Sequence, residues 1–365
     1  MEKILREMIE SDGNHCISFK DFMETALYHP EKGYYRRPVT KIGSKGDFYT
    51  SSNIGDVLGK VLARWYMHLF TVHHIPMHII EIGGGTGRIA EAVLQEWKEQ
   101  FGAYGDLSYT MIEESPYHLE LQQKRLSRFP NVSFFNSLDE ISDIEGVVFS
   151  NELFDAFPVH AVENKRGLLH EIMVGWDNGF IEVPLPLGDR QVQSYLDERG
   201  IVLQDGWRIE IPLPGVSYYR RICKKLAHGV AVTIDYGYTD SELAEPAHRE
   251  GSIRGYHKHR MVNNPLQYPG IMDLTSHIHW DSLIGAGERN GASTLSFLSQ
   301  HEFLVSGGIM SLLAEPAGMD PFSEAFKRNR AIRSLLEPGE ISLHFQVLVQ
   351  GKGIGEGPLY PINCL

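Results

Sequence analysis

Two acidic residues, Glu152 and Asp155, stand three positions apart in the segment SNELFDAFPVHAV, directly after the apolar run GVVFS. Open α/β sheets bind ligands beside the carboxyl ends of their strands, so this spacing places two carboxylates where an active site would form. Paired carboxylates can orient one nitrogen of a guanidinium and localise its electron density for attack on an electrophile. We therefore expect Glu152 and Asp155 to be catalytic. The alternative is that Asp155 caps a helix while Glu152 holds a cofactor or a loop.

A glycine-rich segment, EIGGGTG, follows the apolar run MHIIEI. Gly83, Gly85 and Gly87 would let the backbone approach a ligand where a β-carbon would collide. Their GxGxG spacing differs from the GxGxxG dinucleotide fingerprint, and Glu81 would lie close to any pyrophosphate bound there, which argues against NAD. A sulfonium with a free amino group fits better, because Glu81 can bind that amine directly or through water. We therefore expect S-adenosyl-L-methionine, with a purely structural turn as the alternative.

Further candidate cofactor contacts follow the next strands. Glu113 ends the run LSYTMIE, where an acid can accept hydrogen bonds from both hydroxyls of a ribose, although an exposed strand-end carboxylate is the simpler interpretation. Ser137 and Leu138 follow VSFF, where the adenine ring would lie. The complete set expected to bind the cofactor from these strand ends is Glu81, Gly83, Gly84, Gly85, Thr86, Gly87, Glu113, Ser115, Ser137, Leu138 and Asn151.

Strand-like and helical patterns alternate around these residues from position 77 onward. The apolar runs MHIIEI, LSYTMIE, VSFF, GVVFS and VAVTID are separated by helical patterns, one of them near Tyr117 to Phe129. Strands alternating with helices indicate βαβ units on a parallel sheet, so we expect an α/β, doubly wound, Rossmann-like fold. The last elements expected are a helix from about Pro321 to Leu336 and a strand in ISLHFQVLVQ.

Three regions lie outside this series. Residues 1–75 are expected to be mainly helical: Ser18 can cap a helix, and apolar residues at steps of one and three from Val57 to Leu69 predict another. The segment HEIMVGWDNGFIEVPL predicts a hairpin, and residues 239–290 are polar and without clear periodicity, which predicts an inserted loop or lid. We therefore predict an N-terminal helical region, 1–75, and a core, 76–365, with insertions at about 160–220 and 239–290.

Composition limits the classes of partner. Lysine and arginine total 34 against 47 aspartates and glutamates, a net charge of -13, which disfavours nucleic acid as a ligand. No apolar run approaches the roughly 20 residues of a spanning helix, so membrane insertion is not expected. The first ten residues, MEKILREMIE, carry three acidic side chains, unlike a targeting peptide, and we therefore expect a cytoplasmic protein.

Metal sites and disulfides are not expected either. Cys16, Cys223 and Cys364 lie far apart and form no paired ligand spacing. The HxH pairs in RGYHKHR and DLTSHIHWD have no clear third ligand, so their histidines fit a polar pocket or surface better than a metal site.

Seven segments in order resemble one known family across nearly the whole chain. They are HPEKGYY with GDFYTS, EIGGGTG, IEES, SNELFDAFPVHAV, IDYGY, SIRGYHKHR and PGIMDLTSHIHW. In this order and spacing the chain resembles the MidA-type methyltransferases, a family that includes the mitochondrial complex I assembly factor that methylates an arginine. The resemblance implies a class I methyltransferase fold and S-adenosylmethionine at the glycine turn and Glu113.

The resemblance also implies further site residues. The GDFYTS loop, with Asp47, Thr50 and Ser51, resembles a cover over the cofactor. Three positions depart from the family pattern: Ser52 and Asn53 replace Pro and Glu after TS, and His279 replaces an acid, so two carboxylates are missing. If those acids face a guanidinium, the substrate here would be less cationic. The residues expected to bind the substrate are Asp235, Tyr236, His257, Asp273, Thr275 and His277.

The function expected from these observations is S-adenosylmethionine-dependent N-methylation of an arginine in a protein partner. That partner would be a subunit resembling those of a respiratory complex, and a homodimer is one oligomeric state to test. Two alternatives remain open: methylation of a small molecule, and a non-catalytic assembly chaperone that binds the cofactor. Transfer at a methyl carbon is an in-line displacement, so no nucleophilic side chain is required.

Overall fold

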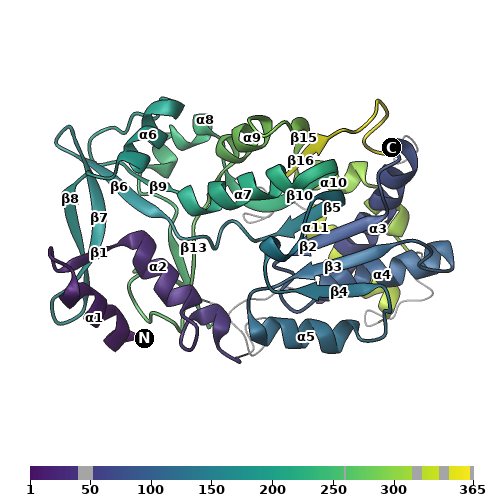
Figure 1. Cartoon of the computed structure of the whole chain (residues 1–365), viewed down its shortest axis with the longest axis horizontal. Helices are drawn as coiled ribbons and strands as arrows, with labels where there is room; N and C mark the ends of the chain where they lie inside the picture. Colours follow the sequence, from purple (N-terminus) through teal and green to yellow (C-terminus); the bar gives the residue numbers. More distant parts are fainter. Residues whose placement is uncertain (40–51, 259, 315–322, 337–344, 362–365) are drawn as a thin grey trace. The chain divides into compact units, whose positions relative to one another are not determined.

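The computed structural model describes residues 1–39, 52–258, 260–314, 323–336 and 345–361 (Figure 1). The chain forms two compact units, each built from three segments. Unit 1 comprises Met1–Tyr49, Phe154–Tyr219 and Tyr236–Leu283, and unit 2 comprises Thr50–Leu153, Arg220–Asp235 and Ile284–Leu365. The domain boundary predicted near residue 75 stays a prediction.

Unit 2 is organised around a mainly parallel sheet. The strand order is β15-β16-β10-β5-β2-β3-β4, in which β10, β5, β2, β3 and β4 pair in parallel and β15 pairs antiparallel with β16. This confirms the predicted α/β fold, because the five parallel strands come from the five apolar runs. The strands are β2 (His78–Ile82), β3 (Ser108–Ile112), β4 (Val132–Phe135), β5 (Ile144–Asn151), β10 (Leu226–Tyr238), β15 (Ser293–Ser299) and β16 (Phe345–Lys352).

Helices follow the strands of unit 2 and pack on the sheet through apolar faces. The apolar pattern from Val57 to Leu69 forms part of α3, in which Val61, Trp65 and Leu69 are fully buried. At Gly59 helices α3 and α4 are so close that a Cβ would lie 2.5 Å from Cβ of Ala92. The helices are α3 (Ser52–His73), α4 (Arg88–Phe101), α5 (Pro116–Leu126), α7 (Leu213–Lys225, shared with unit 1), α9 (Trp280–Glu288, likewise shared), α10 (Gln300–Ser306) and α11 (Glu324–Leu336).

Unit 1 contains an antiparallel sheet in the order β1-β7-β6-β9, with β8 paired to β7. The predicted hairpin is confirmed, because β7 and β8 pair from His170–Pro186 to Trp176–Phe180 around the turn at Asn178. Ser18 caps α2, accepting a hydrogen bond from the Asp21 amide at 3.0 Å. The elements are α1 (Glu2–Ser11), β1 (Cys16–Ser18), α2 (Phe19–Tyr28), η1 (Tyr34–Arg36), β6 (His160–Lys165), β7 (Leu168–Trp176), β8 (Phe180–Pro186), α6 (Arg190–Arg199) and β9 (Arg208–Ile211).

The polar segment after position 238 is ordered in a way that the sequence does not predict. Instead of a loop, it forms a three-stranded antiparallel sheet in the order β12-β11-β13. These strands are three or four residues long, too short for an alternating pattern to be visible in the sequence. The elements are α8 (Asp240–Leu243), η3 (Pro246–His248), β11 (Arg254–His257), β12 (Arg260–Val262), β13 (Asp273–Thr275) and β14 (Ile278–His279), and β14 pairs with the end of β10.

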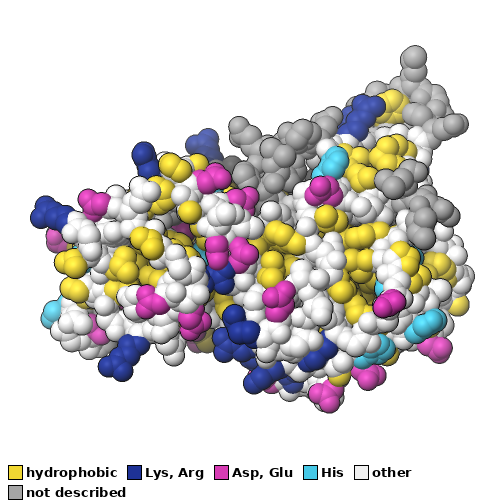
Figure 2. Space-filling view, turned by 90° about the horizontal axis from the view of Figure 1, so that it is seen from above, with side chains coloured by type: hydrophobic (Ala, Val, Ile, Leu, Met, Phe, Trp, Pro, Cys, Tyr) yellow, Lys and Arg dark blue, Asp and Glu magenta, His cyan; other side chains and the backbone are white. Residues whose placement is uncertain are grey.

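The surface carries charges of both signs. On the face shown in Figure 2, acidic and basic side chains are intermixed with apolar ones. Among the residues that the structure describes, no helix combines the length and apolar character needed to cross a membrane.

One buried carboxylate ties α3 to α4. Glu96 is 1% exposed, and its oxygens accept from Arg64 at 2.7 Å and Lys60 at 3.0 Å. Burial alone would raise the pKa of Glu96, but Lys60 and Arg64 outweigh it and the pKa is lowered.

We predict that Glu96→Gln lowers the free energy of unfolding at pH 7 by about 2–3 kcal/mol. This is below the ~3–5 kcal/mol of a fully buried pair, because both cations reach solvent. Because the folded-state pKa is lowered, the stabilisation is present at neutral pH and is lost as pH falls through that pKa, below the ordinary value of 4.5. Urea denaturation between pH 7 and pH 3 measures this, and an effect of the mutation that is independent of pH would contradict it.

Candidate active site

The predicted glycine turn lies between β2 and α4 in unit 2. Gly83, Gly85 and Gly87 have φ of 70°, 51° and 73°, a left-handed backbone that favours glycine. The amide of Gly83 donates to the carbonyl of Ile112 at 2.9 Å, which ties the turn to β3. Gly87 is the N-cap of α4, so the turn ends where the helix presents its free amides.

Space around the turn differs from one glycine to the next. A Cβ at Gly84 would lie 2.5 Å from Cε of Met111 and 2.7 Å from Oε1 of Glu81, so this glycine packs inward. A Cβ at Gly85 would meet nothing within 4 Å. Thr86 is half-buried in the same turn. The backbone at Gly85 therefore borders open space, as a turn that receives a ligand requires.

Glu81 is buried directly beneath this turn. It is 2% exposed, and the hydroxyl of Tyr109 donates to its Oε2 at 2.5 Å. Burial raises the pKa of Glu81 to about 7, the Tyr109 hydrogen bond opposes that rise, and Glu113 adds to it. The carboxyl group can therefore change its charge near neutral pH when a cationic amine binds close to it.

Glu113 directly follows β3, and two of its hydrogen bonds are described. Its Oε1 accepts from the amide of Ser115 at 2.8 Å, and its Oε2 accepts from Nε2 of Gln122 at 3.2 Å. Gln122 also donates to the carbonyl of Gly85 at 3.0 Å, so one buried amide joins the glycine turn to the predicted ribose acid. Gln122 was not predicted from the sequence, where its one signal is that it is a polar residue on the side of α5 that carries the buried His118 and Leu126.

Three more predicted cofactor residues, Ser137, Leu138 and Asn151, lie at the ends of other strands of unit 2 or shortly after them. Ser137 caps the short helix η2 (Leu138–Glu140), and Leu138 is fully buried. Asn151 ends β5, and its Nδ2 donates to Oε1 of Glu152 at 3.1 Å. Asp47, Thr50 and Ser51, and the side chain of Asn53, lie outside the described residues.

Glu152 has a strained backbone at the end of β5. Its φ is 49°, uncommon for a residue other than glycine, and its amide donates to the carbonyl of Ile234 at 2.9 Å, which continues the β5–β10 pairing. Desolvation by the surrounding atoms raises the pKa of Glu152 although solvent reaches the side chain, and the Asn151 amide opposes that rise. Strain of this kind is concentrated at functional positions, which favours the functional interpretation of Glu152.

Asp155 belongs to unit 1 and lies among other predicted substrate residues. It is 5% exposed, and the hydroxyl of Tyr236 donates to its Oδ2. Its carbonyl accepts from the amide of Ser276 at 2.9 Å, and the ring of Tyr236 packs edge-on against His277 with centroids 5.2 Å apart. Asp155 is therefore not a helix cap, and unit 1 brings Asp155, Tyr236 and His277 together.

Asp273, on β13, is a second buried carboxylate of unit 1. Tyr35 donates its hydroxyl to both Asp273 oxygens, at 2.9 and 3.1 Å, and the Leu274 amide donates at 2.9 Å. Burial raises the pKa of Tyr35, and the negative charge of Asp273 raises it further. The Tyr35 hydroxyl therefore keeps its proton. Tyr256 lies opposite Asp273 in the β11–β13 pairing. Burial raises the pKa of Tyr256, and the charges of Asp155 and Asp273 contribute, so both acids lie near this ring.

Other predicted substrate residues take different places. Thr275 is buried on β13 opposite Arg254, and His257 packs on Tyr268 with ring centroids 5.5 Å apart. Asp235 is fully buried on β10 in unit 2. His279, which replaces a family acid, is 2% exposed and bonded through Nδ1 to the hydroxyl of Tyr195 at 2.7 Å. Burial lowers the pKa of His279 to about 3, so the ring is neutral.

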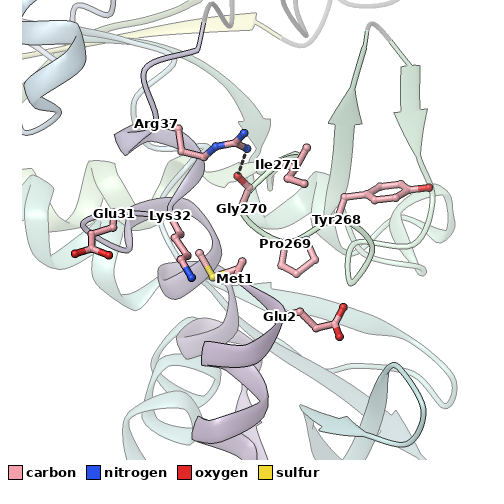
Figure 3. A pocket seen from close by; sticks show the side chains of 9 residues that line it. All are labelled: Met1, Glu2, Glu31, Lys32, Arg37, Tyr268, Pro269, Gly270 and Ile271. Atoms are coloured by element: carbon pink, nitrogen blue, oxygen red, sulfur yellow. Dashed lines mark hydrogen bonds between the residues drawn. The ribbon is translucent and has the colours of Figure 1, made fainter.

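A separate pocket of unit 1 contains none of the predicted site residues. Its volume is about 480 Å³. Figure 3 shows Lys32 and Arg37 beside Gly270, to whose carbonyl Arg37 donates at 2.8 Å. No group of three or more histidine, cysteine or acidic side chains suited to a metal ion occurs in the described part of the chain.

A parallel α/β sheet with a glycine turn at β2 and acids at the ends of β2 and β3 defines a nucleotide-cofactor enzyme of the class I methyltransferase kind. Residues 58–298, more than half of the chain, match the family described as "Putative S-adenosyl-L-methionine-dependent methyltransferase". The protein belongs to this family, and it is an S-adenosylmethionine-dependent methyltransferase.

Named relatives agree with this assignment. The chain is 26% identical over 329 residues to "Protein arginine methyltransferase NDUFAF7, mitochondrial" of Xenopus tropicalis, covering 80% of this chain and 72% of that protein. It is 25% identical over 331 residues to the protein of the same name from Homo sapiens, covering 80% and 70%. These relatives are named as mitochondrial, and they contradict the expected cytoplasmic location.

Solved structures extend the likeness to nearly the whole chain. A COG1565 superfamily member from Burkholderia thailandensis, bound to S-adenosyl-homocysteine, has a TM-score of 0.88 and 28% identity and covers 98% of this chain and 93% of its own. A native structure from the same organism has a TM-score of 0.85 and 29% identity, covering 98% and 92%. The open space at Gly85 and the acids beside it fit the cofactor that this family uses.

We predict that Glu81→Gln stabilises the cofactor-free protein at pH 8 by up to about 3 kcal/mol and much less at pH 5. The raised folded-state pKa means that folding opposes ionisation of Glu81, so its stability contribution is full below pH 4.5 and is lost as pH rises through about 7. Urea denaturation at the two pH values tests this, with Glu145→Gln on an exposed position of β5 as the control. Equal effects at both pH values would show that Glu81 is ionised in the folded protein.

We also predict that Gln122→Leu weakens binding of S-adenosylmethionine by roughly tenfold. The change removes one neutral and one charge-assisted hydrogen bond that fix the turn and Glu113, worth about 1.5 kcal/mol together after relaxation. Calorimetric titration measures this, and Gln123→Leu, one position away and exposed, is the matched control. An affinity equal to that of the control would exclude a role for Gln122 in the site.

Proposed function

We propose that this methyltransferase transfers its methyl group to an arginine of a protein partner. The observation that carries the proposal is the pair of buried carboxylates in unit 1, Asp155 and Asp273, each accepting a hydrogen bond from a tyrosine hydroxyl. Buried carboxylates of this kind favour a cation, and a planar guanidinium matches carboxylates with several donors. The names of the relatives, protein arginine methyltransferases, support the same acceptor.

On this proposal unit 2 binds the cofactor, and unit 1 contributes the buried carboxylates that bind the methyl acceptor. Unit 2 contributes the residues that hold the cofactor: the glycine turn from Glu81 to Gly87, Glu113 with Gln122, and Ser137 and Leu138. When bound, the cofactor supplies an electrophilic methyl group.

The residues proposed to bind the methyl acceptor, called the acceptor residues, include Asp155, Asp273 and His277. They bind the guanidinium and orient one of its nitrogens. Glu152, with Asp155, would localise electron density on that nitrogen and accept the proton that leaves after transfer. Tyr35 and Tyr236 keep the two aspartates fixed, and the aromatic rings around them favour a delocalised cation. His279 is buried against Tyr195 and neutral, so it adds no positive charge that would repel the guanidinium.

The partner is proposed to be a protein rather than nucleic acid. A subunit resembling those of a respiratory complex is the form that the resemblance to the MidA-type family suggests. We also propose a homodimer, which sedimentation would detect. The division of the chain at about residue 75 is proposed as well, and limited proteolysis would locate it.

The test is transfer of a labelled methyl group from S-adenosylmethionine to total protein from cells that lack this gene, followed by acid hydrolysis. We expect label in methylarginine, reduced at least about 100-fold by Glu152→Gln and by Asp273→Asn while S-adenosylmethionine affinity is kept. Asp12→Asn, on an exposed turn, is the control.

Two results would contradict the proposal. Label in a small-molecule fraction instead of protein would favour a metabolite as the acceptor. Cofactor binding with no transfer, together with a cellular function that survives Glu152→Gln, would favour an assembly chaperone.

A further inference from the structure

Glu210 is a buried carboxylate that the proposed reaction does not use. It lies on β9, the edge strand of the larger sheet of unit 1, and is 3% exposed. Its Oε2 accepts two hydrogen bonds from one residue, the amide of Ser252 at 2.8 Å and the hydroxyl of Ser252 at 2.7 Å. A buried polar group costs free energy unless it is hydrogen-bonded, and the side-chain hydrogen bonds described for Glu210 both come from Ser252.

The same segment is fixed to β9 by its backbone. The amide of Arg208 donates to the carbonyl of Arg249 at 2.8 Å, and Arg208 forms a parallel bridge with Glu250. Gly251 has φ of 72°, and a Cβ there would lie 2.2 Å from Oε1 of Glu210. A side chain at position 251 would strain the left-handed backbone and push the Glu210 carboxylate away from its present place, so glycine is favoured there.

Ser252 connects Glu210 to the acceptor residues. Its hydroxyl oxygen also accepts from the amide of His277 at 3.0 Å. The preceding amide, of Ser276, donates to the carbonyl of Asp155 at 2.9 Å. The ring of His277 packs between Tyr236 and Tyr238, with centroids 5.2 and 4.6 Å away. Hydrogen bonds therefore connect Glu210 through Ser252 to the amide of His277, and the adjacent residue in the chain, Ser276, bonds to the carbonyl of Asp155.

Ser252 also precedes the strand that carries other acceptor residues. β11 begins two residues later and pairs with β13, opposite Asp273 and Thr275. Leu274 of this small sheet and Met272, directly before β13, pack in the core of unit 1. Apolar packing is not directional, so it holds the sheet in place without fixing its rotation. The two hydrogen bonds from Ser252 to Glu210 are directional and add to the constraint that the Tyr35–Asp273 hydrogen bonds supply.

We propose that Glu210 is a positioning residue for methyl transfer, which acts through Ser252 to fix the acceptor residues Asp155, Asp273 and His277. The inference rests on the proposed function, because the residues that Glu210 positions are those proposed to bind the methyl acceptor. Glu210 does not touch the acceptor itself. A displacement of about 1 Å in the residues that it positions is enough to lower the rate by roughly 100-fold.

The experiment compares Glu210→Ala, Glu210→Gln and Ser252→Ala with Glu171→Ala. Glu171 is a matched control, since it is a buried carboxylate of the same sheet, 8% exposed and bonded to His160 at 2.7 Å, with no described bond to the segment of Ser252. Amide hydrogen exchange at 252, 276 and 277 measures the positioning without any substrate. Labelled-methyl transfer to arginine in total protein measures its consequence.

We expect Glu210→Ala to increase exchange at these three amides and to lower transfer by up to about 100-fold, with unchanged affinity for S-adenosylmethionine. Ser252→Ala, which removes only the hydroxyl, should release the amide of His277 and lower transfer by about tenfold. Glu210→Gln should resemble the wild type, because its carbonyl oxygen can still accept both bonds from Ser252. Glu171→Ala should lower stability and leave both readings near the wild type.

Two outcomes would overturn the inference. Unchanged exchange at 276 and 277 in Glu210→Ala would show that Glu210 does not position the acceptor residues. A fall in transfer equal to that of Glu171→Ala would show that Glu210 contributes stability only. If the wild type transfers no label to arginine, the proposed function fails, and the exchange measurement alone then decides whether Glu210 positions these residues.

Discussion

Burying a carboxylate at the end of a strand is the constraint on which this molecule depends. An ionised group removed from water costs several kcal/mol unless donors replace the lost solvent. At Glu81, Glu113, Asp155 and Asp273 the donors come from other elements: Tyr109, Gln122, Tyr236 and Tyr35. Each of these hydrogen bonds crosses between strands or helices, so satisfying the acids also fixes the elements that form the candidate site.

The backbone of the glycine turn is also shaped by the burial of a carboxyl group, that of Glu81. Three left-handed glycines bring main-chain atoms to the end of β2, and Gly84 leaves room for the Glu81 carboxyl, 2.7 Å from where its Cβ would be. A turn with side chains would fill that space and displace Glu81 from Tyr109. The conformation of the turn and the burial of Glu81 therefore depend on each other, and the burial raises the pKa of Glu81.

Local patterns predicted much of this arrangement, and contacts distant in sequence explain what they missed. The strands β2, β3, β4, β5 and β10 and the turn at Gly83 follow from apolar runs and glycine spacing, which are local. Tyr35 and Asp273 are 238 positions apart, and no local pattern pairs them. Gln122 resembles any polar helix residue until α5 packs against the glycine turn. The three-stranded sheet was predicted as a loop, because its strands are too short to show alternation.

The donors to buried acids separate two uses of the same group. Glu96 is bonded by Lys60 and Arg64, which cancel its charge and leave a link between α3 and α4. The donors described for Glu81, Asp155 and Asp273 are tyrosine hydroxyls and a main-chain amide, which lower the cost of burial without cancelling the charge. Burial raises the pKa of Tyr35 and of Tyr109, so these hydroxyls stay protonated donors. A carboxylate held by neutral donors keeps its attraction for a cation, and this is why we place the cofactor amine beside Glu81 and the guanidinium beside the two aspartates.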